Sequence, residues 1–354
     1  MKNILKKSDL SISSELGIYS NLYKDIYFDK KHGIKETQHN FIKANNLASR
    51  FKKSDKFIIS ELGFGTGLSF LMTLKLWKET KKPNAKLIYI SFESAPLTKI
   101  ELNNVYKKVS GVKILFNQLI KKLPILYQST HRIFFDSENV ELILIYDDFN
   151  SLKNFKFKAD AWFLDGFAPK KNKSAWNSKL FEQIYLSTKF KGTFSTFTSA
   201  GHVRRGLSNS GFSVSKVAGF GNKKESLIGI KKPPSSKINK VSSSKKYIGP
   251  VAIIGSGISG ASLAYSLRKR NIECFVVDKS SKYASGASGN KLALQMPKLT
   301  QDNSPFGLLS LEAFTYSRNL AKNLNSIPPT NGLIVLPLRE RDQIKYLKLL
   351  QNNW

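Results

Sequence analysis

The sequence predicts an α/β fold in which a mostly parallel sheet is followed by the beginning of a second α/β domain. Apolar, strand-like runs alternate with helical runs along the first part of the chain, which is typical of a parallel sheet. Two of these strands lead directly into glycine-rich turns, at residues 63–67 and 255–260. A stretch rich in Lys, Ser and Pro separates the two turns, which indicates two domains joined by a linker.

The first strand with a functional signal is at residues 57–62. It carries Glu61 near its end and runs into Gly63, Gly65 and Gly67. Glycines let the backbone turn sharply and approach a ligand closely. A carboxylate here suits amino or hydroxyl groups of a ligand, whereas a phosphate site more naturally carries Lys followed by Ser or Thr. This pattern favours S-adenosylmethionine (SAM) as the ligand, and a glycine-rich turn without a ligand is the alternative.

Three later strands of the first domain also end in acidic residues. These acids are Glu93 after residues 87–92, Asp147 and Asp148 after residues 140–146, and Asp165 after residues 161–164. The carboxyl ends of parallel strands meet at one edge of the sheet, so we expect these side chains to share a crevice with Glu61. Glu93 is placed to hold two ribose hydroxyls. Each acid alone could instead cap the following helix, but four in register make that explanation unlikely for the whole set.

The end of the first domain predicts an antiparallel hairpin. After a strand at residues 193–198 and a helix at 203–210, two short strand-like runs follow at 212–217 and 225–230. The loop between them contains two glycines, so the pair reads as a hairpin that closes the sheet. This order is the layout of SAM-dependent methyltransferases, whereas dinucleotide dehydrogenases normally finish with another crossover.

Several stretches of the first domain together resemble the methyltransferase half of the bifunctional MnmC family. They are residues 25–28 with Gly33 and Glu36, residues 61–67, residues 160–169 and residues 200–207. The resemblance covers roughly residues 15–230, and the Asp-Gly-Phe-Ala-Pro block at 165–169 is its most specific part. It implies a Rossmann-like SAM-dependent methyltransferase domain that acts on the primary amine of an aminomethyl-uridine in tRNA, giving 5-methylaminomethyl-2-thiouridine at the wobble position.

The implied reaction gives a role to Asp165. An amine that attacks the methyl group of SAM must be neutral, so the site needs an acceptor for its proton, and Asp165 is the candidate. Whether Asp165 acts as a base or only orients the amine is left open. Phe167 and Pro169 are expected to form an apolar wall. Trp162 is expected in the core, and Trp176 in the core or at the rim.

The resemblance also implies the SAM-binding residues. Glu61, Gly63, Gly65 and Gly67 line the methionine end, Glu93 holds the ribose, and Asp148 reads adenine. The family pattern tends to have Gly-Asp where this chain has Asp147-Asp148, so the adenine assignment is open by one position.

A second cofactor motif follows the linker. A strand predicted to be buried, at residues 251–254, leads into Gly255, Gly257 and Gly260, which form a complete G-x-G-x-x-G before a helical run. The next predicted strand ends at Asp278, 18 residues after the last glycine, near the roughly 20 expected for an acid that binds ribose. The helix amino terminus would hold a pyrophosphate. NAD and FAD share this fingerprint.

The segment at residues 284–290 favours FAD. It is similar to the small-residue segment of glycine-oxidase-like FAD enzymes and of the MnmC oxidoreductase half, which implies flavin contacts at Ser285, Gly286, Ser288 and Gly289. That half of the family removes the carboxymethyl group from carboxymethylaminomethyl-uridine oxidatively. A flavin-type fold that binds no flavin is the alternative.

The expected domains are a methyltransferase at residues 1–231, a linker at 232–248 and a partial FAD-dependent oxidoreductase at 249–354. Only about a hundred residues follow the linker, which is short for an oxidoreductase of this type. Either the chain is a fragment or the oxidoreductase half is degenerate, and we expect this half to be incomplete. The region after residue 301 predicts one helix, at 308–324, and one strand, at 332–337.

The composition agrees with an RNA partner. There are 57 Lys and Arg against 25 Asp and Glu, a formal net charge of +32, which fits a polyanion. The lysines are spread along the chain, so biased codon usage is another explanation. The better candidates for contact with a tRNA anticodon arm are Arg204, Arg205, Lys223 and Lys224, against a role as ordinary surface residues.

The composition also bears on compartment and metals. The one cysteine, Cys274, lies in a strand predicted to be buried, which suits a reducing cytoplasm. Four scattered histidines do not indicate a zinc cluster, and no apolar run is long enough for a membrane span. No metal or protein partner is expected. Two alternative functions remain: methylation of a small amine, and a non-catalytic RNA-binding protein with two empty cofactor folds.

Overall fold

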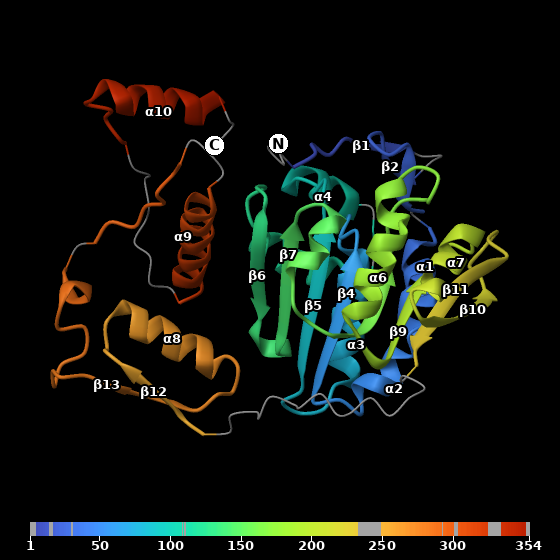
Figure 1. Ribbon diagram of the computed structural model, residues 1–354, viewed down its shortest axis with the longest axis horizontal. Coiled ribbons are helices and arrows are strands. Elements are labelled where there is room, and N and C mark those ends of the chain that lie inside the picture. Colours follow the sequence, from blue (N-terminus) through green and yellow to red (C-terminus); the bar gives the residue numbers. More distant parts are fainter. Residues whose placement is uncertain are drawn as a thin grey trace. The chain divides into compact units, whose positions relative to one another are not determined.

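The computed structural model describes residues 5–13, 17–29, 31–107, 109, 111–232, 249–291, 293–300, 304–324 and 334–351 (Figure 1). The chain divides into two compact units, Met1–Pro233 with Pro297–Trp354 and Pro234–Met296. Across the described ranges, no helix is both long and apolar enough to cross a membrane.

The first unit is built on a mixed sheet with the strand order β10-β11-β9-β8-β4-β5-β7-β6. Its strands are β4 (Lys56–Leu62), β5 (Lys86–Glu93), β6 (Ser129–Phe135), β7 (Val140–Tyr146), β8 (Ala159–Leu164), β9 (Thr188–Thr196), β10 (Phe212–Ala218) and β11 (Glu225–Lys231). The five central strands β9, β8, β4, β5 and β7 are parallel, while β6, β11 and β10 are antiparallel to their neighbours. The predicted mostly parallel sheet with a terminal hairpin is therefore confirmed, and β6 is an addition that the sequence pattern did not predict.

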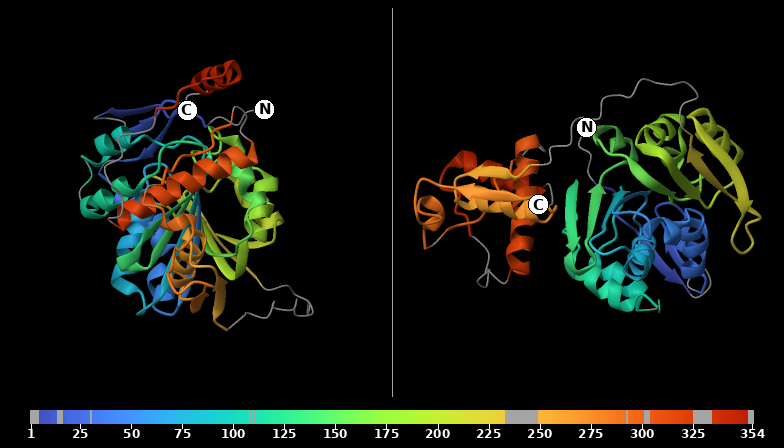
Figure 2. Two further views of the ribbon diagram at one scale, coloured as in Figure 1. Left: turned by 90° about the vertical axis from the view of Figure 1, so that its left-hand side faces the viewer. Right: turned by 90° about the horizontal axis from the view of Figure 1, so that it is seen from below.

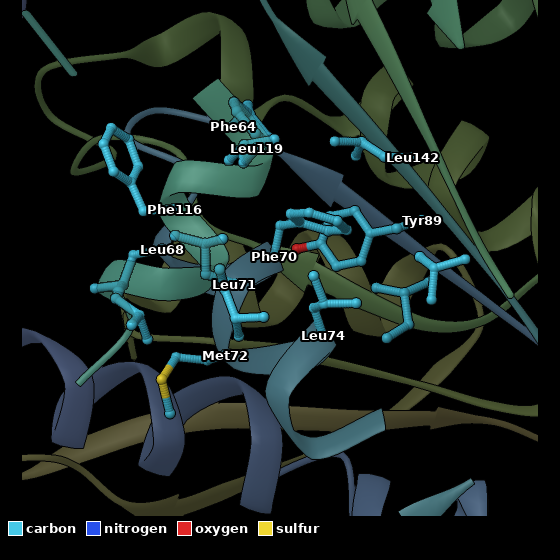
Figure 3. Close-up of a cluster of buried hydrophobic side chains, with 14 of the residues drawn as sticks. Phe64, Leu68, Phe70, Leu71, Met72, Leu74, Tyr89, Phe116, Leu119 and Leu142 are labelled. Carbon is cyan, nitrogen blue, oxygen red and sulfur yellow. The ribbon is translucent and has the colours of Figure 1, made fainter. Parts of the chain in front are cut away.

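Helices cover both faces of this sheet (Figures 1 and 2). One face carries α2 (Leu47–Phe51), α3 (Leu68–Thr80), α4 (Lys99–Tyr106) and α5 (Lys113–Lys122), and the other carries α6 (Ser178–Leu186) and α7 (Gly201–Asn209) with the short turns η3 (Phe149–Asn154) and η4 (Lys173–Trp176). Side chains of a strand point alternately to the two faces, so Phe163 joins one core and Trp162 the other. Figure 3 shows part of the first core, where Phe70 and Leu71 of α3 pack near Tyr89 of β5.

The order of the strands defines where a ligand can bind. From β4 the chain moves through β5 to β7 on one side, and it then returns to β8 on the other side of β4. Such a switch point leaves a crevice outside the carboxyl ends of β4 and β8, because the connections that leave these two strands run to opposite sides of it.

The residues before β4 form elements that the sequence pattern did not predict. Strands β1 (Leu10–Ser13), β2 (Gly17–Ser20) and β3 (Asp25–Phe28) make a small antiparallel sheet. They are followed by α1 (Gly33–Thr37) and by a π-helical segment, η1 (Gln38–Lys43). A short 3-10 turn, η2 (Asp136–Glu138), lies elsewhere, between β6 and β7.

The second unit contains the predicted strand, turn, helix and strand. Strands β12 (Val251–Ile254) and β13 (Cys274–Val277) are parallel, α8 (Ile258–Arg268) connects them, and the turn η5 (Ala287–Gly289) follows. The expectation that both strands are buried is wrong: Ile254 is 92% exposed and Phe275 is 51% exposed. Within this unit, the described residues form a two-stranded sheet with one helix packed against it, and Cys274 is half-buried.

Two helices follow, α9 (Pro305–Asn323) and α10 (Glu340–Gln351). The predicted helix at 308–324 is confirmed. The strand predicted at 332–337 is not formed by residues 334–337, and residues 332 and 333 lie outside the described residues, as does the linker from residue 233 onward. The domain limits 1–231, 232–248 and 249–354 stay a prediction.

The packing of β11 between β9 and β10 leads to a stability prediction. A Cβ on Gly229 would lie 2.1 Å from Cε1 of the buried Phe194 of β9, so Gly229→Val should lower the free energy of unfolding by about 1–3 kcal/mol through overpacking. Urea unfolding followed by circular dichroism measures this. The neighbouring Ile230→Val, at a 40% exposed position, is the control and should change little. Equal stability of the two variants would contradict the pairing of β11 with β9.

Candidate functional site

A cavity of about 240 Å³ lies at the carboxyl ends of β4 and β8. Its wall is built by β3, by the α1–η1 segment, by the turn after β4, by the end of β5, by residues 165–168 and by the loop between β10 and β11. Four of the predicted SAM-binding and catalytic residues lie on this wall, namely Gly63, Gly65, Glu93 and Asp165. The predicted SAM-site residues Glu61, Gly67 and Asp148 lie outside it.

Gly63 joins the two loops of the switch point. It has a φ of +90°, which favours glycine, and a Cβ at this position would lie 2.8 Å from the carbonyl oxygen of Asp165. The turn after β4 therefore packs backbone against backbone on the loop after β8. Gly67, also at positive φ, donates its N–H to the Phe64 carbonyl and begins α3, so its contribution is to the shape of the turn.

Glu93 ties the end of β5 to the same turn. Its carboxylate accepts hydrogen bonds from the N–H groups of Gly65 and Ala95, each at 2.8 Å. Burial raises the pKa of Glu93, and these N–H donors oppose the rise by stabilising the charged form. The carboxylate reaches the cavity wall, as its predicted contact with ribose requires, and that role stays a prediction.

Glu61 lies beneath the turn and not on the cavity wall. It is 1% exposed, and its carboxylate accepts a 2.7 Å hydrogen bond from the Ser91 hydroxyl. Burial raises the pKa of Glu61 well above its ordinary value, and the nearby charge of Asp165 raises it further. The predicted contact of Glu61 with the methionine end of SAM stays a prediction.

Asp147 and Asp148 are engaged locally at the end of β7. Asp148 caps η3, accepting hydrogen bonds from the backbone and the side-chain amide of Asn150. Asp147 accepts one from the Gln128 side chain at 3.0 Å. Of this segment, Phe149 lines the cavity, and the role of Asp148 in reading adenine stays a prediction.

The loop that follows Asp165 is held from two sides. The Ala168 N–H donates to the Asp25 carboxylate at 2.9 Å, and the buried indole N–H of Trp176 donates to the Phe167 carbonyl at 2.7 Å. Trp176 therefore belongs to the core and positions this loop. These contacts join β3 to the loop after β8.

The ring of Phe167 packs against two tyrosines that sequence reasoning missed as site residues. It stacks on Tyr23 with 4.5 Å between ring centroids and meets Tyr27 edge-on at 5.0 Å. All three rings line the cavity, which gives it an aromatic wall on the β3 side. The run at 25–28 within the resemblance was the signal that could have identified this strand.

Asp165, the predicted proton acceptor, lies on the cavity wall. It accepts a 3.3 Å hydrogen bond from the Ser69 hydroxyl. Burial raises its pKa well above the ordinary value and Glu36 adds to the rise, while Ser69 and Lys223 oppose it. A carboxylate with a raised pKa is a stronger proton acceptor, which is compatible with the proton-acceptor role predicted for Asp165; whether it acts as a base or only orients the amine stays open.

Lys223 is the member of the predicted basic group that reaches the cavity. Its ammonium pairs with Glu36 at 3.1 Å and lies 4.6 Å from the ring centroid of Phe197. His39 makes a second link to the hairpin, with Nε2 2.9 Å from the Ala218 carbonyl oxygen. These two contacts therefore hold the β10–β11 hairpin against the α1–η1 segment, across the cavity. Arg204, Arg205 and Lys224 are exposed.

The second glycine-rich turn has the close contacts expected of a dinucleotide loop. Gly255 has a φ of +99°, and a Cβ on Gly260 would lie 1.9 Å from the Gly255 carbonyl oxygen. Asp278 accepts hydrogen bonds from the N–H and the hydroxyl of Ser256. The N–H groups of Ser280 and Ser256 lower the pKa of Asp278 to about 2, so this carboxylate is charged at neutral pH.

The small-residue segment reaches this turn through Ser288. The Ser288 hydroxyl accepts a 3.0 Å hydrogen bond from the N–H of Ile258 at the start of α8, and it lies beside Gly257. Gly289 packs on the Ala284 carbonyl, while Gly286 has open space around it. The turn, the start of α8 and Asp278 fit the adenosine diphosphate part of FAD. Flavin contacts by Ser285, Gly286, Ser288 and Gly289 stay predictions.

Comparison with known families matches both parts of the chain. Residues 110–232 match the family described as S-adenosyl-L-methionine-dependent methyltransferase, and residues 250–354 match the family described as FAD dependent oxidoreductase. The chain therefore carries a SAM-dependent methyltransferase domain followed by part of an FAD-dependent oxidoreductase domain. Among the described residues, no cluster of His, Cys, Asp or Glu suited to a metal ion is found.

Curated relatives share both parts. The chain is 35% identical over 366 residues to the tRNA 5-methylaminomethyl-2-thiouridine biosynthesis bifunctional protein MnmC of Marinomonas sp. (strain MWYL1), an alignment that covers 98% of this chain and 54% of that protein. It is also 35% identical over 339 residues to the protein of the same name from Marinobacter nauticus, covering 94% of this chain and 53% of the relative. The chain spans about half the length of these relatives.

A solved structure shares the fold. The crystal structure of MNMC2 from Aquifex aeolicus matches with a TM-score of 0.52 and 24% sequence identity, over 65% of this chain and 72% of that one. At this identity the likeness supports the fold alone.

The burial of Glu61 predicts a pH-dependent effect on stability. Because the pKa of Glu61 is higher in the folded chain than in the unfolded one, folding is penalised progressively as pH rises from the unfolded value through the folded value. Glu61→Gln removes this penalty and should raise the melting temperature at pH 8 by roughly 3 °C or more, with a much smaller gain at pH 5, just above the ordinary pKa of a glutamate. Differential scanning fluorimetry at both pH values measures this.

The exposed Glu79 of α3 provides the control, because Glu79→Gln changes the same functional group without burial. An equal gain at both pH values for Glu61→Gln would contradict a titrating Glu61.

Proposed function

We propose, since this chain belongs to the bifunctional MnmC family, that its methyltransferase domain transfers a methyl group from SAM to the primary amine of 5-aminomethyl-2-thiouridine in tRNA. The observation that carries this proposal is the cavity in which the glycine turn after β4 and the Asp165 side chain share one wall. The product is 5-methylaminomethyl-2-thiouridine at the wobble position.

SAM supplies an electrophilic methyl group, and the residues of the cavity position the amine and take up its proton. The amine nitrogen forms a bond to the methyl carbon while the bond from that carbon to sulfur breaks, leaving S-adenosylhomocysteine. Asp165, whose raised pKa makes it a better acceptor, receives the proton that the amine must lose. Phe167, with Tyr23 and Tyr27 around it, excludes water from one side and holds the uridine in place.

The basic residues around the cavity support a tRNA substrate. Lys223 lies on the cavity wall, and Lys224 is its exposed neighbour in the same loop. The exposed Arg204 and Arg205 belong to α7. We assign these four residues to phosphates of the anticodon arm, with the wobble uridine turned out of its loop into the cavity. Cys274 is half-buried and forms no disulfide, which agrees with a reaction in the reducing cytoplasm.

We further propose that the oxidoreductase part belongs to the preceding step. In that step the carboxymethyl group of 5-carboxymethylaminomethyl-2-thiouridine is removed oxidatively, which yields the amine for methylation. FAD would supply the oxidising equivalents. The turn at Gly255, Gly257 and Gly260 and the start of α8 would hold its pyrophosphate, and Asp278 its ribose.

The decisive experiment is methyl transfer from labelled SAM to tRNA that bears aminomethyl-uridine. Asp165→Asn should lower kcat by about 100-fold or more because proton acceptance is lost, while SAM binding is kept. Asp136→Asn, at an exposed site in the turn η2, is the control and should be fully active. Ribonuclease treatment should abolish transfer.

Two outcomes would contradict this function. A folded chain that binds SAM but does not methylate this tRNA would exclude the substrate. Transfer to free small amines that survives ribonuclease would favour a small-amine methyltransferase in its place.

The Glu36–Lys223 pair predicts opposite shifts in the pH profile of kcat. Glu36 raises the pKa of Asp165 and Lys223 lowers it, so Lys223→Met should move the acidic limb to higher pH and Glu36→Gln should move it to lower pH. Activity falls below the pKa of Asp165 because the protonated carboxyl cannot accept a proton. Measuring kcat at saturating tRNA from pH 5 to 9 tests this, and shifts in the same direction for both variants would refute it.

A further inference from the structure

Asn40 is a buried polar residue in the cavity that the proposed reaction does not use. It lies in the π-helical segment η1, is 2% exposed, and lines the cavity. Its amide oxygen Oδ1 has no hydrogen-bond partner. Buried polar atoms in proteins are nearly always paired, so an unpaired acceptor in a residue that lines a cavity points to a donor on a ligand.

A second buried asparagine, Asn45, follows η1, and the protein supplies hydrogen-bond partners for its side-chain amide. The amide nitrogen of Asn45 donates to the Phe41 carbonyl at 3.0 Å and to the Ser195 hydroxyl at 2.7 Å, and its oxygen accepts from Thr193 at 2.6 Å. Asn45 is therefore held entirely by the protein. The free oxygen of Asn40 is a local feature of the cavity, and π-helical turns frequently occur at functional sites.

The surroundings of Asn40 favour a nitrogen donor. Asp165 and Glu36 place two carboxylates on the same cavity wall, and Glu36 lies four residues before Asn40 along the helical segment, about one turn away. Two donors on the cavity wall already have carboxylate partners. The Ser69 hydroxyl donates to Asp165, and the Lys223 ammonium pairs with Glu36. A wall with three acceptors suits an amine or ammonium nitrogen, which carries two or three N–H groups.

We propose that Asn40 Oδ1 accepts a hydrogen bond from an alkyl amine or ammonium group bound next to Asp165. Two groups of this chemistry enter the site under the proposed function: the α-ammonium of the methionine part of SAM, and the aminomethyl nitrogen of the uridine. The inference rests on the proposed function only for the identity of these ligands. Asn40 is thus a binding residue for the nitrogen, separate from the proton acceptor.

The test replaces Asn40 by leucine, which has the same branched shape and number of heavy atoms but no hydrogen-bond acceptor. Binding of S-adenosylhomocysteine, which has the ammonium, and of 5′-methylthioadenosine, which lacks it, is measured by isothermal titration calorimetry without tRNA. The KM for tRNA bearing aminomethyl-uridine is measured separately. Loss of a hydrogen bond to a charged group should weaken binding by about 10- to 100-fold.

The two sources of the nitrogen give different results. Weaker binding of S-adenosylhomocysteine with unchanged binding of methylthioadenosine assigns Asn40 to the ammonium of the cofactor. Unchanged binding of both with a raised KM for the tRNA assigns it to the acceptor amine. In either case Asn40→Asp, which keeps an acceptor, should bind the nitrogen ligand better than Asn40→Leu.

Asn45→Leu is the matched control, because it removes an asparagine that the protein itself uses. It should lower the melting temperature by several degrees and have no effect specific to the amine, whereas Asn40→Leu should not lower it. No change in any binding constant or KM for Asn40→Leu would overturn the proposal. Equal weakening of both adenosine ligands would also overturn it, since Asn40 would then only shape the cavity. Calorimetry without tRNA remains informative even if methyl transfer to tRNA fails.

Discussion

The close packing of the Gly63 backbone on the Asp165 carbonyl is the contact on which the site depends. Strands β4 and β8 are neighbours at the switch point of the sheet, and the turns that leave them meet where no side chain fits. Because this contact fixes the glycine turn against the Asp165 loop, a ligand in the turn lies near the carboxylate. Asp25 and Trp176 hold the same loop from outside, so the position of Asp165 is determined by several elements at once.

The site also concentrates negative charge in an otherwise basic chain. Glu61, Glu93 and Asp165 lie close together at the strand ends, and burial raises the pKa of all three. Each is held by a different donor: Ser91, backbone N–H groups or Ser69. This arrangement loses stability at high pH, and the raised pKa of Asp165 suits its proposed role as the proton acceptor.

The sequence predicted the central strands, the two glycine turns and the hairpin because each has a local pattern of apolar residues, glycines and acids. It did not predict that Tyr23 and Tyr27 surround Phe167, since these contacts join residues far apart in the chain and have no local signature. For the same reason Asn40 was not identified: its free oxygen is a property of the packed cavity. The burial of β12 and β13 was predicted wrongly because an apolar strand does not reveal which of its faces is covered.

The contacts between the hairpin loop and the α1–η1 segment affect the order in which the domain can be completed. In the sequence, Lys223 follows Glu36 by 187 residues, and Ala218 follows His39 by 179 residues. Ribosomes synthesise a chain from its amino terminus, so Glu36 and His39 are made well before β10 and β11. Their contacts with the hairpin form only after these last two strands have been synthesised. In a nascent chain this side of the cavity therefore stays open until nearly the whole domain has been synthesised.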